Sequence, residues 1–343
     1  MREQLSHPMN CHIENIITDP LHPMWNDSSN GASGIFDLPF SVDEASVIIV
    51  PVPWDAACSQ GRGTANAPQL ILDCSRYVEL HDLVLGNIYE RGIAMTAPNE
   101  QLKSLISQVQ KQQNQHADEW ELPVDTVCQQ LNQLVMGEIR HHLQKNRATG
   151  LLGGDHSVSF GSIAAHLDAF PDMGILQIDA HADLRPSLDG MTWSHASVMR
   201  HVMETLHPPC LTQVGIRGIC SVERAYHASN DRITMFTDHD IQMKLAEGQT
   251  WMSICDAIIN SLPNEVYLTL DIDGLDPSYC PHTGTPVPGG MTFVQVLLLL
   301  HRIIASGRTI RGFDLVEVGG HAQDALIAAH LLYPLCGLVE KRG

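Results

Sequence analysis

Short runs of apolar and β-branched residues recur along the chain, and segments with apolar residues at helical spacing separate them. Runs such as 47–52, 174–178 and 265–270 have the length and composition of buried strands. The predicted strands are 47–52, a segment near 151, 174–178, 211–216, 233–236, 265–270 and 310–316. The predicted helices begin at 67 or span 123–144, 157–167, 194–206, 251–262, 292–305 and 322–335. Because strands and helices alternate, the sequence predicts an α/β fold of three layers, α/β/α, with a mostly parallel sheet.

Residues 1–45 do not share this alternation. They are rich in turn-forming residues, above all over 26–34, which predicts a loop-rich N-terminal extension. Such an extension is either disordered or wraps a neighbouring subunit. No internal repeat or low-complexity linker interrupts residues 46–343, so this part is predicted to form a single domain. Within it, the polar segment 100–115 reads as a helix with a solvated face or as a connection.

Polar residues with metal-binding side chains stand directly after the predicted strand 174–178. They are Asp179, His181 and Asp183, in a D-x-H-x-D pattern. In an extended chain, alternate residues project to one face, so these side chains converge on one point if the strand continues. The carboxyl end of a strand is also where open α/β sheets place their ligand sites. Alone, the pattern is also compatible with a solvated turn, as the less favoured alternative.

Two further strand ends repeat the arrangement, which argues against the solvated turn. Asp271 and Asp273 end the run 265–270, and Asp155 and His156 follow the segment near 151. So many carboxylates in a partly dehydrated cleft would repel one another without a cation. Nitrogen and oxygen ligands without a thiolate suit divalent ions such as Mn²⁺, with Ni²⁺ or Co²⁺ as alternatives. The sequence therefore predicts a binuclear metal centre with six ligands: His156, Asp179, His181, Asp183, Asp271 and Asp273.

Composition narrows the range of partners. The formal net charge of −19 argues against nucleic acid or an anionic membrane as a partner. Nine cysteines are scattered without a C-x-x-C pair, which indicates free thiols in a reducing cytoplasm. The first residues lack the apolar centre of a signal peptide, and no apolar run reaches the roughly 20 residues that span a bilayer. A soluble, cytoplasmic protein is expected.

Several motifs together resemble the signatures of the ureohydrolase family, which contains the arginases and agmatinases. The resemblance runs from about Val47 to Leu338 and implies an arginase-like fold. It also implies a hydrolase that acts on C–N bonds of linear amidines and assembles into trimers or hexamers. The motifs are Gly-Gly-Asp-His-Ser at 153–157, Asp-Ala-His-Ala-Asp at 179–183, Asp-Ile-Asp-Gly-Leu-Asp-Pro at 271–277, Thr-Gly-Thr-Pro-Val-Pro-Gly-Gly at 283–290 and Asp-Leu-Val-Glu at 314–317.

The resemblance also implies a role for each metal ligand. Asp179 and Asp271 would bridge the two ions. The first ion would be completed by His156 and Asp183, and the second by His181 and Asp273. Two such ions lower the pKa of a shared water molecule toward neutrality, which makes it a nucleophile. The neighbouring Asp155 is expected to fix loop or histidine geometry rather than to bind metal.

Two further residues are assigned to catalysis. Glu317 can accept two parallel N–H bonds from a planar guanidinium and so orient its carbon over the nucleophile. His195 lies about where arginases and agmatinases carry an active-site histidine, and its near-neutral pKa suits proton delivery to the leaving nitrogen. His201 and His282 are weaker candidates for that role.

The substrate is less well defined, because this chain departs from the arginase pattern at 189–194 and at Arg185. Both departures argue against L-arginine. An Arg185 side chain inside the pocket would repel the ammonium of agmatine and attract a carboxylate, whereas one pointing outward would be uninformative. Trp193 either stacks on a guanidinium or simply packs, and Thr283 is a further candidate for substrate contact.

The expected function is agmatinase-like hydrolysis of a small guanidino compound with release of urea. The candidate substrates are agmatine, guanidinobutyrate, guanidinopropionate and free guanidine. One alternative is a formiminoglutamase-type amidine hydrolase. Another is a non-catalytic relative that acts as a regulatory partner, although such relatives typically lose metal ligands. A single-zinc deacetylase is disfavoured by the ligands for a second metal, His181 and Asp273.

Overall fold

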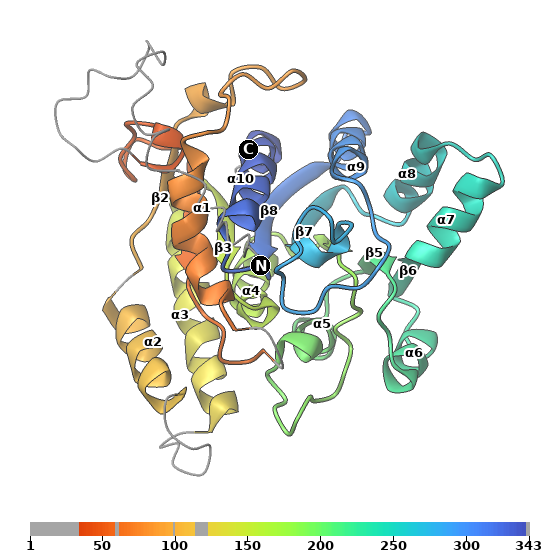
Figure 1. Ribbon diagram of the computed structural model, residues 1–343, viewed down its shortest axis with the longest axis horizontal. Coiled ribbons are helices and arrows are strands. Elements are labelled where there is room, and N and C mark those ends of the chain that lie inside the picture. The colour runs from red at the N-terminus through yellow and green to blue at the C-terminus, as the bar shows by residue number, and fades with distance from the viewer. Residues whose placement is uncertain (1–33, 59–61, 99, 114–122, 341–343) are drawn as a thin grey trace, which may run out of the picture.

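The structure is a computed structural model, and it describes residues 34–58, 62–98, 100–113 and 123–340. Its centre is one eight-stranded sheet with the order β2-β1-β3-β8-β7-β4-β5-β6, in which every pairing of neighbouring strands is parallel (Figure 1). The strands are β1 (Val47–Val52), β2 (Ile93–Met95), β3 (Ala148–Gly153), β4 (Gly174–Ile178), β5 (Leu211–Ile216), β6 (Ile233–Thr237), β7 (Glu265–Asp271) and β8 (Thr309–Val316). The predicted parallel α/β architecture is confirmed.

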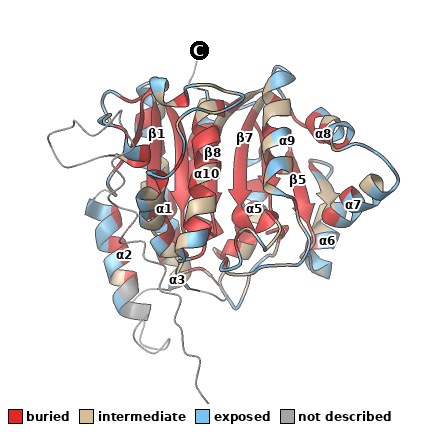
Figure 2. Ribbon diagram, turned by 45° about the horizontal axis from the view of Figure 1, so that its top comes forward, coloured by how far each residue is buried: buried red, intermediate tan, exposed pale blue. Residues whose placement is uncertain are grey.

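Helices cover both faces of this sheet, and most strand residues are buried between them (Figure 2). The helices are α1 (Ala67–Ser75), α2 (Glu100–Gln113), α3 (Val124–Gln144), α4 (Ser159–Ala169), α5 (Val198–His201), α6 (Ser221–Ala228), α7 (Asp238–Ala246), α8 (Trp251–Asn260), α9 (Phe293–Ala305) and α10 (Ala322–Leu338). No helix among the described ranges combines the length and apolar character needed to cross a bilayer.

Strand β1 shows how the two faces are built. Val47 and Ile49 point into a core shared with α1, α8, α9 and α10. Ile48 and Val50 point the opposite way, into a core shared with α2 and α3. Alternate residues of a strand project to opposite faces, so a continuous apolar run is what a sheet buried on both sides requires. Helices α4 and α5 extend the second layer over β4 and β5.

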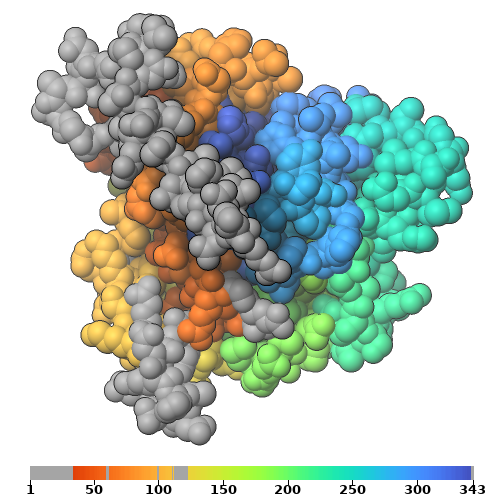
Figure 3. Space-filling model, viewed as in Figure 1, coloured from red at the N-terminus to blue at the C-terminus, as the bar shows by residue number. Residues whose placement is uncertain are grey.

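The helices at the two ends of the sheet come from different parts of the chain. In the space-filling view, the orange and yellow segments form one side of the molecule and the cyan segments the opposite side (Figure 3). Helices α2 and α3 accordingly lie at the β1 end of the sheet, and α6 and α7 lie at the β6 end (Figure 1). The middle of the sheet, β3-β8-β7-β4, is therefore flanked by strands on both sides.

Three elements are absent from the sequence prediction: β2, α6 and α7. Strand β2 has only three residues, and the two helices are short and mixed in polarity. The predicted helix 194–206 is also broken into pieces, with a 3₁₀ turn at 195–197, then α5, then a π-helical turn at 202–206. The other predicted strands and helices are present, with ends displaced by a few residues at most.

The predicted N-terminal extension lies mostly outside the described residues. Its last part, from Gly34, packs on the domain rather than standing apart from it. Ile35, Phe36 and Leu38 are buried in the core. The Phe36 amide donates to Ser75 Oγ at 2.7 Å, and its ring meets Tyr333 with centroids 4.9 Å apart.

Candidate active site

The four central strands deliver the predicted site residues to one edge of the sheet. His156 follows β3, Asp179 follows β4, Asp271 ends β7 and Glu317 follows β8. Because all four strands are parallel, their carboxyl ends meet at the same edge. The sheet order β3-β8-β7-β4 makes these strands neighbours. Along the chain, each of the three connections between them contains at least one helix.

The first candidate metal-binding group surrounds one nitrogen of His156. Its Nε2 lies 2.8 Å from the Thr269 hydroxyl, which in turn donates to Asp314 Oδ1 at 2.8 Å. The opposite nitrogen, Nδ1, is buried and lies 2.9 Å from Asp183 Oδ2, 3.2 Å from Asp179 Oδ2 and 3.4 Å from Asp271 Oδ2. A hydrogen bond thus holds one ring nitrogen while the other faces carboxylates, which is the geometry of a metal-ligating histidine.

The second candidate group shares Asp179 with the first and adds His181 and Asp273. His181 Nδ1 lies 2.9 Å from Asp273 Oδ2 and 3.8 Å from Asp179 Oδ1. That Asp273 oxygen is buried. The six predicted metal ligands are thus brought together around two adjacent points, and Asp179 belongs to both.

The chain reaches this arrangement differently from the predicted continuation of β4. The strand ends at Ile178, and Asp183 adopts a left-handed φ of 52°. Asp179 Oδ1 accepts from the His181 amide at 2.6 Å, which curls the loop back toward its own strand. His181 also forms an isolated parallel bridge with Gly218, where a Cβ atom would lie 2.6 Å from His181 Cδ2. Close backbone approach, rather than strand alternation, makes the three side chains converge.

The electrostatics of the group fit bound cations. Burial and the negative charge of neighbouring carboxylates raise the pKa of Asp179 to about 7. The same two causes raise the pKa of Asp271 well above its usual range. Burial alone would lower the pKa of His181, but the hydrogen bond to Asp273 and nearby negative charges raise it to about 9. Divalent cations would relieve this repulsion and hold the carboxylates ionised. The donor set, all nitrogen and oxygen, suits such ions.

Glu317 and His195 lie next to each other beside the first group. The side chain of Glu317 is buried, and its Oε1 accepts from the His156 amide at 2.8 Å and lies 3.3 Å from His195 Nδ1. Glu317 adopts a left-handed φ of 59°, a conformation that costs energy in a non-glycine residue. Burial lowers the pKa of His195, but the hydrogen bond and charge of Glu317 outweigh this effect and raise it to about 9.

Asp155 stabilises the loop that carries His156. Its Oδ2 accepts from the Ala57 amide at 2.9 Å, and its Oδ1 accepts from the Ser157 amide at 3.0 Å. The residue is fully buried and lies outside both metal-binding groups. Burial, reinforced by the charge of Glu317, raises its pKa to about 7. The geometry is that of a carboxylate which fixes a loop.

A cavity of about 320 Å³ opens onto these residues. Asp183, Asp271, His181 and His195 form its inner wall. Its remaining wall comes from the segments that follow β4, β5 and β7 and from the first turn of α6. Its described lining residues are His181, Asp183, Arg185, Leu188, His195, Ala196, Gly218, Ile219, Cys220, Glu223, Asp271 and Thr285.

The three residues predicted to contact substrate have different positions. Arg185 lines the cavity, and its Nε lies 3.8 Å from Glu223 Oε2. Trp193 is absent from the lining, because its ring stacks on His201 at 4.6 Å and meets Phe160 in a T-shaped arrangement. Thr283 is also absent from it, since its hydroxyl donates to the Glu317 carbonyl at 2.7 Å. The weaker candidate His201 therefore packs on Trp193.

Sequence reasoning missed one wall of the cavity, formed by residues 218–220 and Glu223. Glu223 is buried because it accepts from the Leu184 and Cys220 amides, at 3.1 and 2.8 Å. These residues follow β5, so the rule that ligand sites lie at carboxyl ends of strands could have found them. A capping pair, Cys220 with Glu223 three residues later, marked the start of α6.

Comparisons with known proteins agree with this geometry. The model of the Arginase family matches residues 45–337. An N(1)-aminopropylagmatine ureohydrolase of Thermus thermophilus is 34% identical over 304 residues, covering 88% of this chain and 92% of that protein. The agmatinase of Bacillus subtilis is 32% identical over 176 residues, covering 51% and 57% of the two chains. The solved agmatine ureohydrolase of Thermoplasma volcanium has the same fold, with a TM-score of 0.71, 22% identity and coverage of 90% and 95%.

Proposed function

The chain belongs to the arginase family, and from this premise we propose that it hydrolyses the guanidino C–N bond of a small guanidino compound and releases urea. The observation that carries the proposal is the buried Nδ1 of His156, which faces three carboxylates at once. Bound cations would offset the cost of burying so many carboxylates together. Relatives that are hydrolases of amidine C–N bonds give the reaction class.

The proposed cofactors are two divalent metal ions. His156, Asp179, Asp183 and Asp271 would hold the first, and His181, Asp179, Asp271 and Asp273 the second. When bound, the pair supplies Lewis acidity and lowers the pKa of a water molecule. We favour Mn²⁺ among ions suited to nitrogen and oxygen ligands, with Ni²⁺ and Co²⁺ as alternatives.

Glu317 and His195 would act on the substrate itself. A guanidinium reaching Glu317 gains a charge-assisted hydrogen bond that orients its central carbon. His195 lies 3.3 Å from the same carboxylate, so it would stand beside the leaving nitrogen. With a pKa of about 9 it carries a proton at neutral pH, and it would deliver that proton as the C–N bond breaks. The products are urea and a protonated amine.

Arg185 supports a finer proposal about the substrate tail. Its side chain is about 40% exposed and lines the cavity that contains the metal-binding residues. A guanidinium in this wall would attract a carboxylate, as in guanidinobutyrate or guanidinopropionate. We propose a short guanidino acid as the preferred substrate.

A cationic tail is the second candidate, and Glu223 supports it. This buried carboxylate lies on the same wall and faces Arg185, so it reduces the net positive charge there. The Thermus relative named for aminopropylagmatine, 34% identical to this chain, points the same way. An ammonium-bearing substrate such as agmatine would then be favoured.

Urea release from a substrate panel separates the two candidates. Protein loaded with Mn²⁺ or Ni²⁺ would be given guanidinobutyrate, guanidinopropionate, agmatine, arginine and free guanidine. Arg185→Gln should raise KM for the guanidino acids about tenfold, the value of one lost charged hydrogen bond. It should leave free guanidine unaffected, because that substrate has no tail. Arg224→Gln, at an exposed arginine of α6, is the matched control.

With formiminoglutamate added to the panel, four outcomes are informative. Activity on guanidino acids that depends on Arg185 supports the carboxylate tail. Higher activity on agmatine, improved by Arg185→Gln, would replace it with the cationic tail. Formamide release from formiminoglutamate, without urea from any guanidino compound, would instead identify a formiminoglutamase-type enzyme. Silence of a metal-loaded protein on every compound would favour the non-catalytic relative.

The cellular setting is also a proposal. Every cysteine among the described residues is a free thiol, which suits a reducing cytoplasm. By analogy with the family we propose a homo-oligomer, a trimer or hexamer, without nucleic acid or membrane as partner. Sedimentation analysis of the purified chain tests the subunit number.

A further inference from the structure

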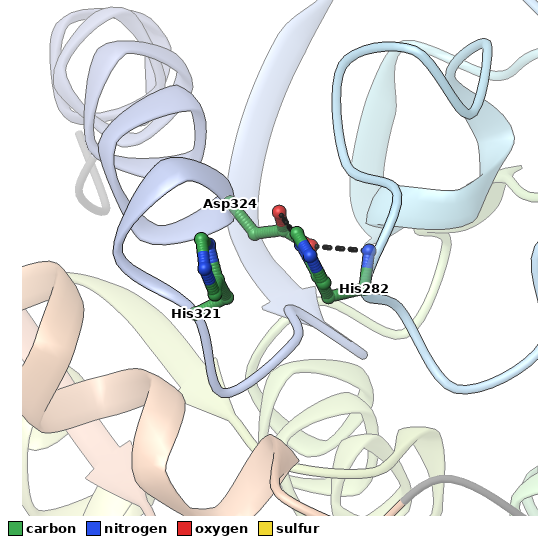
Figure 4. A group of neighbouring side chains, drawn as sticks. All are labelled: His282, His321 and Asp324. Atoms are coloured by element: carbon green, nitrogen blue, oxygen red, sulfur yellow. Dashed lines mark hydrogen bonds and ion pairs between the residues drawn. The ribbon is translucent and has the colours of Figure 1, made fainter. Parts of the chain in front are cut away.

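Two histidines and an aspartate form a second cluster of metal-binding side chains outside the active-site cavity. His282 lies in the loop between β7 and α9, His321 is the N-cap of α10, and Asp324 lies in the first turn of that helix (Figure 4). One ligand atom from each lies within 4.8 Å of the others. None of the three residues lines the active-site cavity. We propose that this cluster is an additional site for a divalent transition-metal ion, with His282 and His321 as its ligands.

Asp324 prepares His282 for this role. The carboxylate is fully buried, and its two oxygens accept from the His282 amide and from His282 Nδ1, each at 2.9 Å. A carboxylate that accepts from one imidazole nitrogen fixes the ring and leaves the lone pair of Nε2 directed away from it. This carboxylate–histidine arrangement is the usual support of a metal-ligating histidine.

The backbone around Asp324 is built closely enough to hold the carboxylate in place. A Cβ atom at Gly319 would lie 2.2 Å from the His282 carbonyl oxygen and 2.9 Å from Asp324 Oδ2. A glycine is therefore required at this position, because any side chain would separate the loop of His282 from the start of α10. The close contact shields the Asp324 carboxylate from water. Its hydrogen bonds with His282 are stronger in this buried setting than they would be in water.

His321 supplies the second imidazole. Its ring stacks on that of His282, with centroids 4.0 Å apart and planes inclined by 20°. Both histidines are exposed, and the side chain of His282 is 44% exposed. His321 Nδ1 accepts from the Gln323 amide at 3.3 Å, a long and therefore weak cap. Parallel rings do not aim their lone pairs at one point, so binding requires the rings to fan apart. Their exposed position leaves room for that rotation.

The chemistry of the ligands selects the ion. Two nitrogen ligands in a tetrahedral site with bonds of about 2.0–2.1 Å lie about 3.3 Å apart, a separation that a modest turn of the stacked rings reaches. Imidazole favours Zn²⁺, Ni²⁺ and Cu²⁺ over Mg²⁺ and Mn²⁺. Water would complete the coordination. This site should therefore discriminate against the manganese proposed for the active site.

An ion at this position would join the loop that contacts Glu317 to the segment that follows Glu317 in the chain. Thr283, next to His282, donates to the Glu317 carbonyl at 2.7 Å. His321 follows Glu317 by four residues. Since a bound ligand stabilises only the folded state, Zn²⁺ should raise the melting temperature through a cross-link between these segments.

The test is a count of bound zinc by equilibrium dialysis with elemental analysis of the full chain, at micromolar free Zn²⁺. The wild type should bind one ion more per chain than His282→Ala or His321→Ala. His239→Ala, at an exposed histidine of α7 outside every described cluster, should match the wild type. Asp324→Asn keeps the size and an acceptor but removes the charge, and it should weaken this ion's binding about 10–100-fold.

Equal zinc counts in the wild type and in both histidine variants would overturn the proposal. So would equal zinc-dependent increases in melting temperature in the wild type, His282→Ala and His321→Ala. Both histidines are exposed, so their removal should leave the fold intact, which circular dichroism checks. Because the readout is a difference in ions between variants, it is independent of whether urea is released from any substrate.

Discussion

The edge of the central strands and the outer wall of the cavity differ in what holds their side chains. At the strand edge, His156, Asp179 and Asp271 are buried directly after strands whose positions are set by the sheet. In the outer wall, Arg185 lies on the loop after β4 and Glu223 lies in the first turn of α6, and both line the cavity. The strand edge is thus determined by the fold, whereas the wall is determined by loop packing.

This difference suggests that the strand edge determines the reaction and that the outer wall determines the substrate preference. Chemistry common to a family needs ligands in nearly invariant positions, which rigid strands provide. A wall made of loops can change its charge without disturbing the sheet. We therefore expect changes at the strand edge to abolish turnover, and changes in the wall to alter substrate preference or stability only.

The largest effect is expected from Asp179→Asn. This residue belongs to both candidate metal-binding groups, and an amide is a poor ligand for two cations at once. Urea release should fall by several orders of magnitude and bound metal should decrease. The measurement is activity together with metal content per chain. Asp172→Asn, at an exposed aspartate, should change neither, and a fully active Asp179→Asn protein with two ions would exclude a bridging role.

A smaller loss is expected from Glu317→Gln. The amide can still accept from the His156 backbone, but it no longer offers a negative charge to the guanidinium. We expect kcat/KM to decrease about 10²–10³-fold with metal content unchanged. Steady-state kinetics and elemental analysis separate these effects. Glu247→Gln, at an exposed glutamate, is the control, and metal loss from Glu317→Gln would reassign the residue to the metal centre.

The same contrast explains what could be predicted from sequence. The proposed metal ligands stand at or after the ends of short apolar runs, and each run is a buried strand that sets the position of the ligands. The pattern could not show that β4 ends at Ile178, because the return of the loop depends on a backbone contact with Gly218, distant in sequence. Helix α6 and its Glu223 were missed because the helix has only eight residues and is polar on average.

A pH profile tests the pairing of His195 with Glu317, again at the strand edge. Since the pKa of His195 is raised to about 9, its protonated form persists at neutral pH and is lost as the pH rises. In the wild type, kcat/KM should therefore decline above pH 9, by about tenfold for each further unit. Glu317→Gln should move this alkaline limb to lower pH, because the charge that stabilises the imidazolium is gone. An unmoved limb would mean that another group titrates there.

The smallest effect on catalysis is expected from Trp193→Phe, next to the cavity but not in it. The indole stacks on His201 and meets Phe160, so its removal should cost packing rather than substrate contact. Phenylalanine keeps an aromatic ring with less area, and we expect unfolding free energy to decrease by about 1 kcal/mol. Urea denaturation should record that decrease while kcat/KM stays within about twofold. The opposite pattern, lost activity at unchanged stability, would place Trp193 among the residues that contact substrate and extend the active site beyond the cavity wall.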